Sequence, residues 1–407
     1  MINFKNISSI ILSLLFLNIL YSQDTLKLTY YNILNFPSQQ QDRVDTLRKI
    51  IDFIQPDIFV VNELTSFNGA MLIKNNALNV NGLDRYSSAL FYDGPDTDNL
   101  LYYDSDKFGL YSQNQISTTL RDISEYVLFH KSENLNNFSD TTLIYFYSLH
   151  LKAGNSSESE ERRNQDAVIF KQYLLENEIG KNIFVGGDFN FYNDSELACQ
   201  EIQFGQNIDL IDPIDKMGNW HSNIAFNDCH TQSTRLNTGG YAGGANGGMD
   251  DRFDFIFISE DLISGQNGVK YLNDSYLAEG QDGSYFNQEL NLFSNNAVSQ
   301  DVASALFHMS DHLPVSLLFT VDNTLTSAEM RVENKIFYNS HLKSLVVDDI
   351  SEIQYLNISD INGKSLFKKS HFIKDFTTID LSMLKFGFYI LNCKTKYSTI
   401  AIKIIIN

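Results

Sequence analysis

The segment SDHLP at residues 310–314 runs directly into the apolar segment VSLLFT at residues 315–320. A carboxylate and an imidazole, Asp311 and His312, therefore stand side by side at the start of a predicted strand, where Pro314 restricts the backbone. Ser and Asp are common capping residues, so a plain cap is the commoner explanation of this segment taken alone. The rest of the chain decides whether these two side chains have a chemical role.

Strands and helices are predicted through about 300 residues on the N-terminal side of this segment. Alternating or continuous apolar runs predict strands at residues 25–34, 58–61, 100–103, 143–151, 183–185, 253–258 and 315–320. Helical spacing predicts a helix over 38–55, with its apolar face at Val44, Leu47, Ile51 and Ile54, and another over 160–177, with Ala167, Phe170, Tyr173 and Leu174. Strands mixed with helices over this length predict one α/β domain with a layered core.

Both ends of the chain differ from this domain. Residues 1–22 combine an early lysine with a short apolar core and predict a secretory signal peptide, since the apolar core is too short to span a bilayer. The α/β domain then extends over 23–321, a linker over 322–332, and a small all-β domain over 333–407. No later segment is long and apolar enough to cross a membrane, so a secreted or surface-attached monomer is expected, exported through the periplasm.

The net charge is −20 and is unevenly distributed, because residues 333–407 carry ten lysines against seven acidic residues. That segment has a net charge of +3, so the rest carries −23, which argues against a broad basic surface for duplex DNA. An enzyme whose bound cation offsets the negative charge locally remains compatible. Of the three cysteines, Cys199 and Cys229 could pair in an exported protein, with Cys393 left over, and the lack of CxxC argues against a zinc-thiolate site.

Polar side chains gather at the predicted strand ends, where an α/β scaffold presents reactive groups. Asn32 and Glu63 follow buried strands, and His150 interrupts an apolar one. A strand-end hydrogen bond, a salt bridge or a core histidine would explain each of them singly. The segment GGDFN is more specific, because two glycines let the backbone turn tightly or approach a ligand just before Asp188 and Asn190.

Asp254 lies within a predicted strand, in DDRFDFIF, and needs a partner for its carboxylate. His312 is the expected partner, and the pair would orient the imidazole and stabilise its charged form. A simple strand-end salt bridge is the alternative. Arg121, in TTLRDISEYVL, would bind a phosphate or else pair with Asp122 or Glu125.

Taken together, these residues suit phosphodiester cleavage. Asn32, Glu63 and Asp311 offer the oxygen ligands of a hard cation, with Mg²⁺ expected and Mn²⁺ or Ca²⁺ as alternatives. Cleavage needs such a cation, an activated water and donors around the phosphoryl oxygens. His150 and His312, with the remaining Asp and Asn side chains, would supply the last two.

The order of the motifs along the chain resembles the endonuclease/exonuclease/phosphatase superfamily, which includes deoxyribonuclease I. The matching segments are YNILN, VVNEL, LLYYDSDKF, SLHLKAG, GGDFN, DDRFDFIF and SDHLP, within about residues 26–321. Each motif is short, but all of them in this order are specific. The resemblance implies a four-layer α/β/β/α sandwich with the site across the top of two packed sheets.

The resemblance also implies a role for each side chain. Asn32 and Glu63 match the divalent-metal ligands, and the position of Asp311 serves the same site. In this chain Asn62 stands before the metal glutamate, where the family usually has Gln, which puts one supporting hydrogen bond in doubt.

The remaining matches concern the water and the phosphate. Asp188 and Asn190 match the residues that hold the attacking water and the phosphate. His312, oriented by Asp254, contacts the scissile phosphate or takes the proton of the water, and His150 stabilises the phosphoryl oxygens or assists the leaving group. The resemblance leaves the identity of the general base open.

The C-terminal segment IDLSMLKFGFYILNCKTKYSTIAIKIIIN resembles the sorting domain of type IX secretion, which an outer-membrane exporter recognises. The matching residues are Ser382, Leu384, Gly387, Tyr389 and Lys403. A generic β-sandwich that binds another ligand is the alternative.

Three functions follow from these patterns. The first is a secreted metal-dependent nuclease, an endonuclease acting on extracellular nucleic acid. The second is a phosphoesterase on a lipid or small substrate, similar to sphingomyelinases or inositol phosphatases, and the acidic charge favours it. The third, a binding protein without catalysis, is disfavoured because the full set of reactive residues is present. Trp220, His221 and His230 lie in a loop region that would either stack a base or pack.

Overall fold

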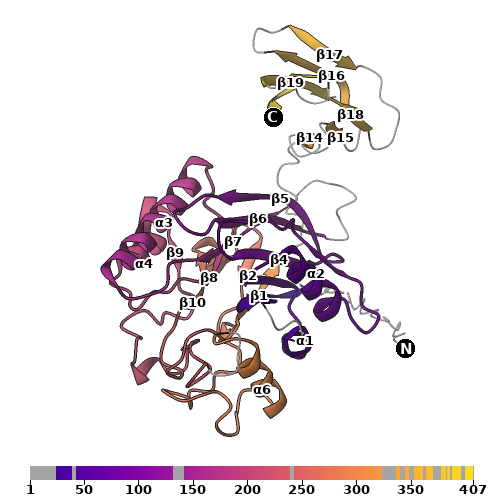
Figure 1. Cartoon of the computed structure of the whole chain (residues 1–407). Coiled ribbons are helices and arrows are strands. Elements are labelled where there is room, and N and C mark those ends of the chain that lie inside the picture. Colours follow the sequence, from indigo (N-terminus) through magenta and orange to yellow (C-terminus); the bar gives the residue numbers. More distant parts are fainter. Residues whose placement is uncertain are drawn as a thin grey trace, which may run out of the picture.

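The computed structural model describes most of the predicted α/β domain and parts of the C-terminal domain (Figure 1). The described residues are 24–38, 43–131, 142–238, 243–322, 336–339, 344–347, 353–360, 364–369, 377–381, 383–385, 387–395 and 399–406. The predicted signal peptide at 1–22 and residues 323–332 of the predicted linker lie outside them.

The first sheet contains the strand that follows SDHLP. Its order is β11 (Val269–Tyr271), β13 (Val315–Val321), β1 (Thr25–Phe36), β2 (Ile58–Leu64), β4 (Asp98–Asp104) and β3 (Tyr86–Ser88), and β12 (Leu277–Ala278) also pairs with β13. Strands β1 and β2 are parallel, whereas β13 and β4 flank them in antiparallel pairing. Their apolar residues are almost fully buried, as expected for central strands covered on both faces.

The second sheet packs against the first. Its order is β5 (Phe108–Ile116), β6 (Ile123–His130), β7 (Leu143–His150), β8 (Ile183–Asp188), β10 (Asp254–Ser259) and β9 (Leu210–Ile211), with β7 and β8 parallel. Aromatic rings fill the space between the sheets: the ring centroids of Phe146 and Phe184 lie 5.4 Å apart, and those of Phe184 and Phe319 lie 5.1 Å apart. Offset ring pairs of this kind stabilise a core beyond the area that they bury.

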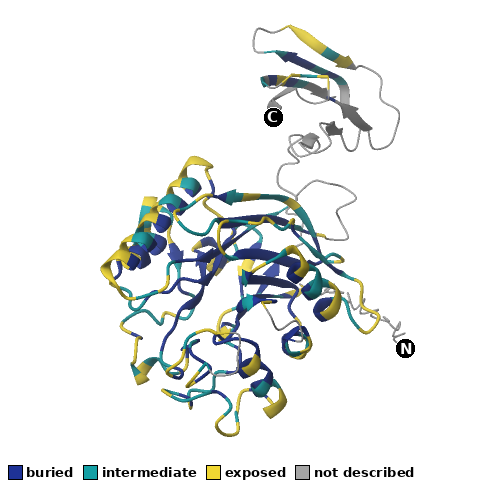
Figure 2. Ribbon diagram, in the orientation of Figure 1, coloured by how far each residue is buried: buried dark blue, intermediate teal, exposed yellow. Residues whose placement is uncertain are grey.

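Helices cover the outer faces of both sheets. The side chains of α1 (Arg43–Ile54) and α6 (Gln300–Met309) join the core of the first sheet, and those of α3 (Ser157–Glu176) and α4 (Leu197–Phe204) join the outer face of the second. Shorter helical segments are α2 (Phe67–Leu72), a π-helix at Ile73–Leu78, α5 (Asp261–Ser264) and 3₁₀ turns at Gly205–Asn207 and Ile224–Phe226. The architecture is therefore the expected four-layer α/β/β/α sandwich, with its buried residues concentrated in the sheets (Figure 2).

Both predicted helices form with slightly different bounds. The predicted helix over 38–55 is described from Arg43 to Ile54, and its four predicted apolar residues are buried. The predicted helix over 160–177 begins three residues earlier, at Ser157, because the hydroxyl of Ser156 accepts from the backbone N–H of Ser159 and caps it.

The sequence left open whether Cys199 pairs with Cys229, and in this structure both thiols are free and buried. Sγ of Cys199, within α4, accepts from Nε2 of Gln203, whereas Sγ of Cys229 donates to the carbonyl of Phe226. Burial raises the pKa of the Cys229 thiol to about 11, so it stays protonated and unreactive at neutral pH. The side chain of Cys393 lies outside the described part of the structure.

The C-terminal part is all-β where it is described, as predicted. Three strands pair in the order β14 (Ile336–Asn339), β15 (Ser344–Val347) and β18 (Thr377–Asp380), and four in the order β17 (Ser365–Lys369), β16 (Ile353–Asp360), β19 (Gly387–Thr395) and β20 (Thr399–Ile406). Strands β16 and β17 are antiparallel neighbours on either side of the predicted NGK turn, of which residues 361–363 lie outside the description. Leu384, Gly387 and Tyr389 of the sorting motif are described, and Ser382 is not.

No helix among the described residues combines the length and the apolar character needed to span a bilayer.

Candidate active site

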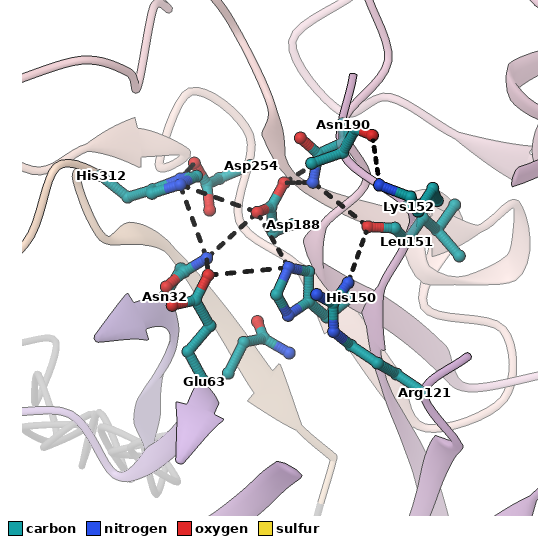
Figure 3. A network of polar contacts seen from close by, with 12 residues as sticks. Asn32, Glu63, Arg121, His150, Leu151, Lys152, Asp188, Asn190, Asp254 and His312 are labelled. Carbon is teal, nitrogen blue, oxygen red and sulfur yellow. Dashed lines mark hydrogen bonds and ion pairs between the residues drawn. The ribbon is translucent and has the colours of Figure 1, made fainter. Parts of the chain in front are cut away.

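The predicted site residues lie where strand ends of the two sheets meet (Figure 3). Asn32 is in β1 beside Asn62 of the parallel strand β2, and Glu63 follows in β2. In the second sheet, His150 at the end of β7 pairs in register with Asp188 at the end of β8. Parallel neighbours present their C-terminal ends at the same edge, and this brings the side chains of both sheets together.

Asn32 links the two sheets through its side-chain amide. Its Nδ2 donates to Oε1 of Glu63 and to Oδ2 of Asp188, at 3.0 Å in each case. Its Oδ1 accepts from the backbone N–H of Leu34 at 3.0 Å, which fixes the orientation of the amide. Two carboxylates from different sheets thus share one donor at the centre of the site.

Glu63 has a strained and fixed position. Its φ is 62°, which is uncommon for a residue with a side chain, and the backbone N–H of Asn35 donates to its Oε2 at 2.9 Å. Burial, and after it the charge of Asp311, raises the pKa of its carboxyl group above the ordinary value. A bound cation would offset both the cost of burying the ionised carboxyl group and its repulsion by Asp311.

Gly186 of GGDFN allows the two sheets to approach closely, and Gly187 allows β8 to lie close against its neighbour β7. A Cβ on Gly186 would lie 2.5 Å from the ring of Tyr30, and one on Gly187, whose φ is 130°, would lie 2.0 Å from the carbonyl oxygen of Leu149. No other residue fits either position without displacing a neighbour. The next residue, Asp188, therefore reaches the first sheet with its carboxylate.

Asp188 is held on both oxygens. Its Oδ1 accepts from the backbone N–H of Asn190 at 3.1 Å and from Asn190 Nδ2 at 2.8 Å, while its Oδ2 faces Asn32. Asn190, whose φ is 53°, also donates to the carbonyl of Leu151. Burial raises the pKa of Asp188 to about 7; the charge of His312 opposes the rise, and Asp254 and Glu63 add to it.

His312 makes the contact expected from the sequence. Its Nδ1 lies 2.8 Å from Oδ2 of Asp254, and its Nε2 lies 3.7 Å from Oδ2 of Asp188. Burial disfavours the charged ring, but Asp254, Asp188 and Asp311 outweigh it and hold the pKa of His312 well above the usual range. The pair thus resembles an oriented imidazole beside its carboxylate.

Gln232 is a site residue that the sequence did not reveal. Its Nε2 lies 2.6 Å from Nε2 of His312 and donates to Oδ2 of Asp311 at 3.1 Å. The amide nitrogen of Gln232 can donate to His312 Nε2 only when the ring is neutral. When the ring is charged, Nε2 carries a proton, and the amide of Gln232 must turn so that its oxygen accepts that proton's hydrogen bond. Gln232 lies in an irregular segment with no periodic pattern, and no sequence signal marks it.

Asp311 lies beside this group rather than at its centre. Its Oδ2 also accepts from the backbone N–H of Ala245 at 2.6 Å, and its buried Oδ1 has no hydrogen-bond partner among the described residues. A Cβ on Gly244 would lie 2.7 Å from its carboxyl carbon, so the glycine-rich segment must pass without side chains there. An unpartnered buried carboxylate oxygen is suited to a cation.

His150 completes the group from the second sheet. Its Nε2 lies 3.7 Å from Oε1 of Glu63 and 3.6 Å from Oδ2 of Asp188. Burial, and after it the charge of Arg121, lowers the pKa of His150 well below its usual value, so the ring is neutral at pH 7. A neutral imidazole both donates and accepts, and it can also ligate a metal.

A second set of side chains could also hold a cation, beside the set predicted from the sequence. One ligand atom from each of Glu63, His150 and Asp188 lies within 4.8 Å of the others. The sequence places the cation among Asn32, Glu63 and Asp311, and this set stays a prediction. The donor set as a whole fits a divalent cation, because buried carboxylates converge there with raised pKa values and an unpartnered oxygen.

Arg121 lies next to the group but has a different partner from those considered. Its Nε lies 2.8 Å from Oδ2 of Asp96, rather than near Asp122 or Glu125, and its Nη1 donates to the carbonyl of Leu151 at 3.3 Å. Glu125 instead accepts from the hydroxyl of Tyr147. The guanidinium is thus fixed beside His150 while its side chain keeps a 15% exposed fraction.

Two of the three residues noted in the loop region between motifs pack rather than face solvent. Trp220 is fully buried and donates to the carbonyl of Phe191, and His230 is fully buried with its Nε2 at the carbonyl of Trp220. His221 is exposed and pairs with Asp251 at 2.6 Å. Stacking on Trp220 or His230 is therefore excluded in this structure.

Asn62, the departure from the family pattern, ties the sheets together behind Glu63. Its Nδ2 donates to Oδ1 of Asn99 at 2.6 Å, to the hydroxyl of Ser148 at 3.0 Å and to the carbonyl of Leu149 at 3.2 Å. The shorter amide therefore bonds across the sheets through its Nδ2, but none of these bonds reaches Glu63, and its buried Oδ1 has no hydrogen-bond partner among the described residues.

Replacing Asn62 with alanine is expected to lower the free energy of unfolding by about 1–3 kcal/mol, because the buried Oδ1 of Asn99 loses its donor. Urea unfolding followed by circular dichroism measures the change. Asn76→Ala, at an exposed position, is the matched control and should stay within about 0.5 kcal/mol of the parent protein. Equal stability of both variants would contradict the bridging role of Asn62.

Comparisons with known proteins found matches for both parts of the chain. Residues 338–407 match the secretion system C-terminal sorting domain. Similar solved structures include D. rerio TDP2 complexed with a single-strand DNA product (15% identity, covering 74% of this chain and 100% of that chain, TM-score 0.48). The chain is also similar to the human Nocturnin catalytic domain with bound sulfate (15% identity, covering 74% of this chain and 97% of that chain, TM-score 0.45). It is similar as well to an endonuclease/exonuclease/phosphatase family protein from Bacteroides thetaiotaomicron (14% identity, covering 74% of this chain and 100% of that chain, TM-score 0.45).

No curated protein matches the chain. The family model described as the Endonuclease/Exonuclease/phosphatase family matches residues 29–312, which is more than half of the chain. The matched segment begins within β1 and ends at His312, so it contains every residue of the group described above. The chain therefore belongs to the endonuclease/exonuclease/phosphatase family of metal-dependent hydrolases that act on phosphoester bonds.

Proposed function

We propose that the chain is an exported phosphodiesterase that uses Mg²⁺ and hydrolyses extracellular nucleic acid as an endonuclease. The observation that carries this proposal is the convergence of Glu63, His150 and Asp188 within 4.8 Å, beside an Asp254–His312 pair at 2.8 Å. Such a group combines a cation site, a place for a water and an oriented imidazole. Phosphodiester hydrolysis requires all three.

The cation would be held by Glu63 with His150 and Asp188, or by Glu63 with Asp311 and Asn32 if the Asn32 amide turns so that its Oδ1, and not its Nδ2, faces the ion. When bound, it would offset the negative charge that develops on the phosphoryl oxygens. Every carboxylate named here is already fixed by hydrogen bonds from neighbouring groups. These carboxylates are therefore positioned before any ion or substrate enters, which lowers the cost of binding.

Asp188 and Asn190 would position the attacking water. Oδ2 of Asp188 lies 3.6 Å from Nε2 of His150 and 3.7 Å from Nε2 of His312, so a water beside it is within reach of both rings. The oxygen of this water bonds to phosphorus while the bond to the leaving alcohol oxygen breaks. The proton that the water releases passes to Asp188 or to the neutral ring of His150, and one proton returns to the leaving oxygen.

The two histidines would have different tasks. Asp254 fixes the ring of His312 and favours its charged form, which suits contact with the scissile phosphate. His150 is neutral and can donate to a phosphoryl oxygen or to the leaving group. Arg121, held by Asp96 next to His150, would bind a further phosphate of the substrate.

The sorting domain supports export to the cell surface or beyond. We infer a catalytic domain at 23–321 after a signal peptide at 1–22, a linker at 322–332 and a sorting domain at 333–407, which the outer-membrane type IX machinery would recognise. A second candidate function is hydrolysis of a lipid or small phosphoester. The net charge of −23 outside residues 333–407 favours it, since it offers no broad basic surface to a long polyanion.

One assay separates these possibilities. Purified protein is incubated with plasmid DNA, RNA, sphingomyelin and a chromogenic phosphodiester, each with Mg²⁺ and with a chelator. The proposal predicts that plasmid is converted to open-circular and linear forms and that the chelator abolishes the conversion. Activity on sphingomyelin or the small phosphodiester without any cleavage of plasmid or RNA would refute the nuclease assignment and support the second function.

A further inference from the structure

A small polar cavity lies apart from the group described above, at the start of β4. It has a volume of about 10 Å³, enough for one water or one ion. None of its lining residues belongs to the candidate active site. Three segments that are separate in the sequence supply oxygen-bearing side chains: Thr97, Asp98, Asn99, Gln115, Asp122 and Ser124. The side-chain oxygens of Asn99 and Gln115 already accept from Asn62 and Ser124, which leaves the carboxylates and the hydroxyl of Thr97 for an occupant.

Asp98 has an unsatisfied carboxylate oxygen in this cavity. The residue is 8% exposed, and its Oδ1 accepts from the backbone N–H of Gly94 at 2.8 Å. Its Oδ2 is buried and has no hydrogen-bond partner among the described residues, and the same is true of the neighbouring hydroxyl of Thr97. Burying an unpaired carboxylate oxygen is costly, so an occupant that neutralises it is expected.

The charge around the cavity is negative. Burial raises the pKa of Asp98 to about 6; the N–H of Gly94 opposes this rise, and the carboxylates of Asp93, Asp122 and Asp96 add to it. A water could hydrogen-bond to Asp98 but would carry no charge to offset the neighbouring carboxylates. A cation answers both requirements.

The donors select the class of cation. The lining contains carboxylates, amides and hydroxyls and no histidine or cysteine. Ca²⁺ binds six to eight oxygen atoms of mixed type in irregular geometry, whereas Mg²⁺ requires near-octahedral geometry and keeps its waters. Zn²⁺ and Cu²⁺ prefer nitrogen or sulfur ligands.

We propose that this cavity is a second cation site, which takes Ca²⁺ between Asp98 and Asp122 and joins the acidic segment 93–98 to the residue that precedes β6. The site would also stabilise the surroundings of the catalytic group. Asp96 of the same segment pairs with Arg121, and Asn99 accepts from Asn62 directly behind Glu63. The proposal is independent of the substrate of the enzyme.

The test is calorimetric titration of CaCl₂ into full-length, metal-stripped protein. Glu63→Gln serves as the background, because it weakens binding at the catalytic group. In this background one Ca²⁺ site is expected to remain, and adding Asp98→Asn should weaken it at least tenfold; Asp122→Asn should act in the same direction. Asp84→Asn removes one exposed carboxylate elsewhere and should leave the affinity unchanged.

Two results would overturn the proposal. One is the absence of any Ca²⁺ binding in the Glu63→Gln background, which would leave water as the occupant. The other is an unchanged affinity in both Asp98→Asn and Asp122→Asn. Circular dichroism of each variant establishes that loss of binding does not come from unfolding. Since no substrate is used, failure here leaves the nuclease proposal standing, and failure of the plasmid assay leaves this site standing.

Discussion

Replacing His312 with alanine is expected to lower the rate of phosphodiester hydrolysis by about 10²–10⁴-fold. The imidazole is held 2.8 Å from Asp254 and faces Asp188, so its removal takes away the oriented group nearest the expected water. Initial rates on a chromogenic phosphodiester at saturating Mg²⁺ measure the effect. The rate should fall while the far-UV circular dichroism spectrum stays unchanged.

The matched control is His308→Ala. His308 is exposed on α6, four residues before His312 in the chain. Its variant should retain a rate within about twofold of the parent protein, since surface substitutions seldom disturb a distant site. If His312→Ala also kept a near-normal rate, the role assigned to the Asp254–His312 pair would be wrong.

Glu63→Gln is expected to lower the rate by about 10²–10³-fold, which corresponds to the several kcal/mol that a metal contributes to transition-state stabilisation. It should also raise the Mg²⁺ concentration needed for half-maximal activity. Glutamine keeps the size of the side chain and can still accept the hydrogen bond from Asn32 or Asn35. The lost property is therefore the negative charge that a cation requires.

Stability in the absence of metal distinguishes this role from a structural one. The raised pKa of Glu63 means that its ionised form destabilises the fold near neutral pH, so the glutamine variant should be at least as stable as the parent protein in chelator. Added Mg²⁺ should then stabilise the parent protein more than the variant. Glu160→Gln, on the exposed side of α3, is the control and should change neither property. A strongly destabilised Glu63→Gln protein in chelator would contradict the account.

The sequence predicted the strands that carry the site because each has a strong apolar signal. All seven predicted strands are present, and polar residues at their ends, such as Glu63 and Asp188, stand out against apolar neighbours. Strand β5, by contrast, was not predicted. Its residues FGLYSQNQI are largely polar and half-exposed, so local pattern carries little information, and its pairing with β6 stabilises it instead.

Contacts between distant segments were the least predictable part of the site. Gln232 reaches His312 across 80 residues, and Arg121 pairs with Asp96 rather than with the nearer acids Asp122 and Glu125. Local spacing has no information on such pairs, because chain folding between the segments decides them. The same reason explains the cysteines: Cys199 and Cys229 are close enough in sequence to pair, but each packs in its own buried environment.

The central claim is that side chains from both sheets converge on a single cation that acts on a phosphoester. The most direct test is a crystal structure of the protein grown with MnCl₂. Mn²⁺ scatters X-rays anomalously and accepts oxygen ligands similar to those of Mg²⁺. The account predicts an anomalous peak within about 2.5 Å of a carboxylate oxygen of Glu63, between the ends of β2 and β8. Density that places Glu63 and His312 on different faces, with no peak between the sheets, would contradict it.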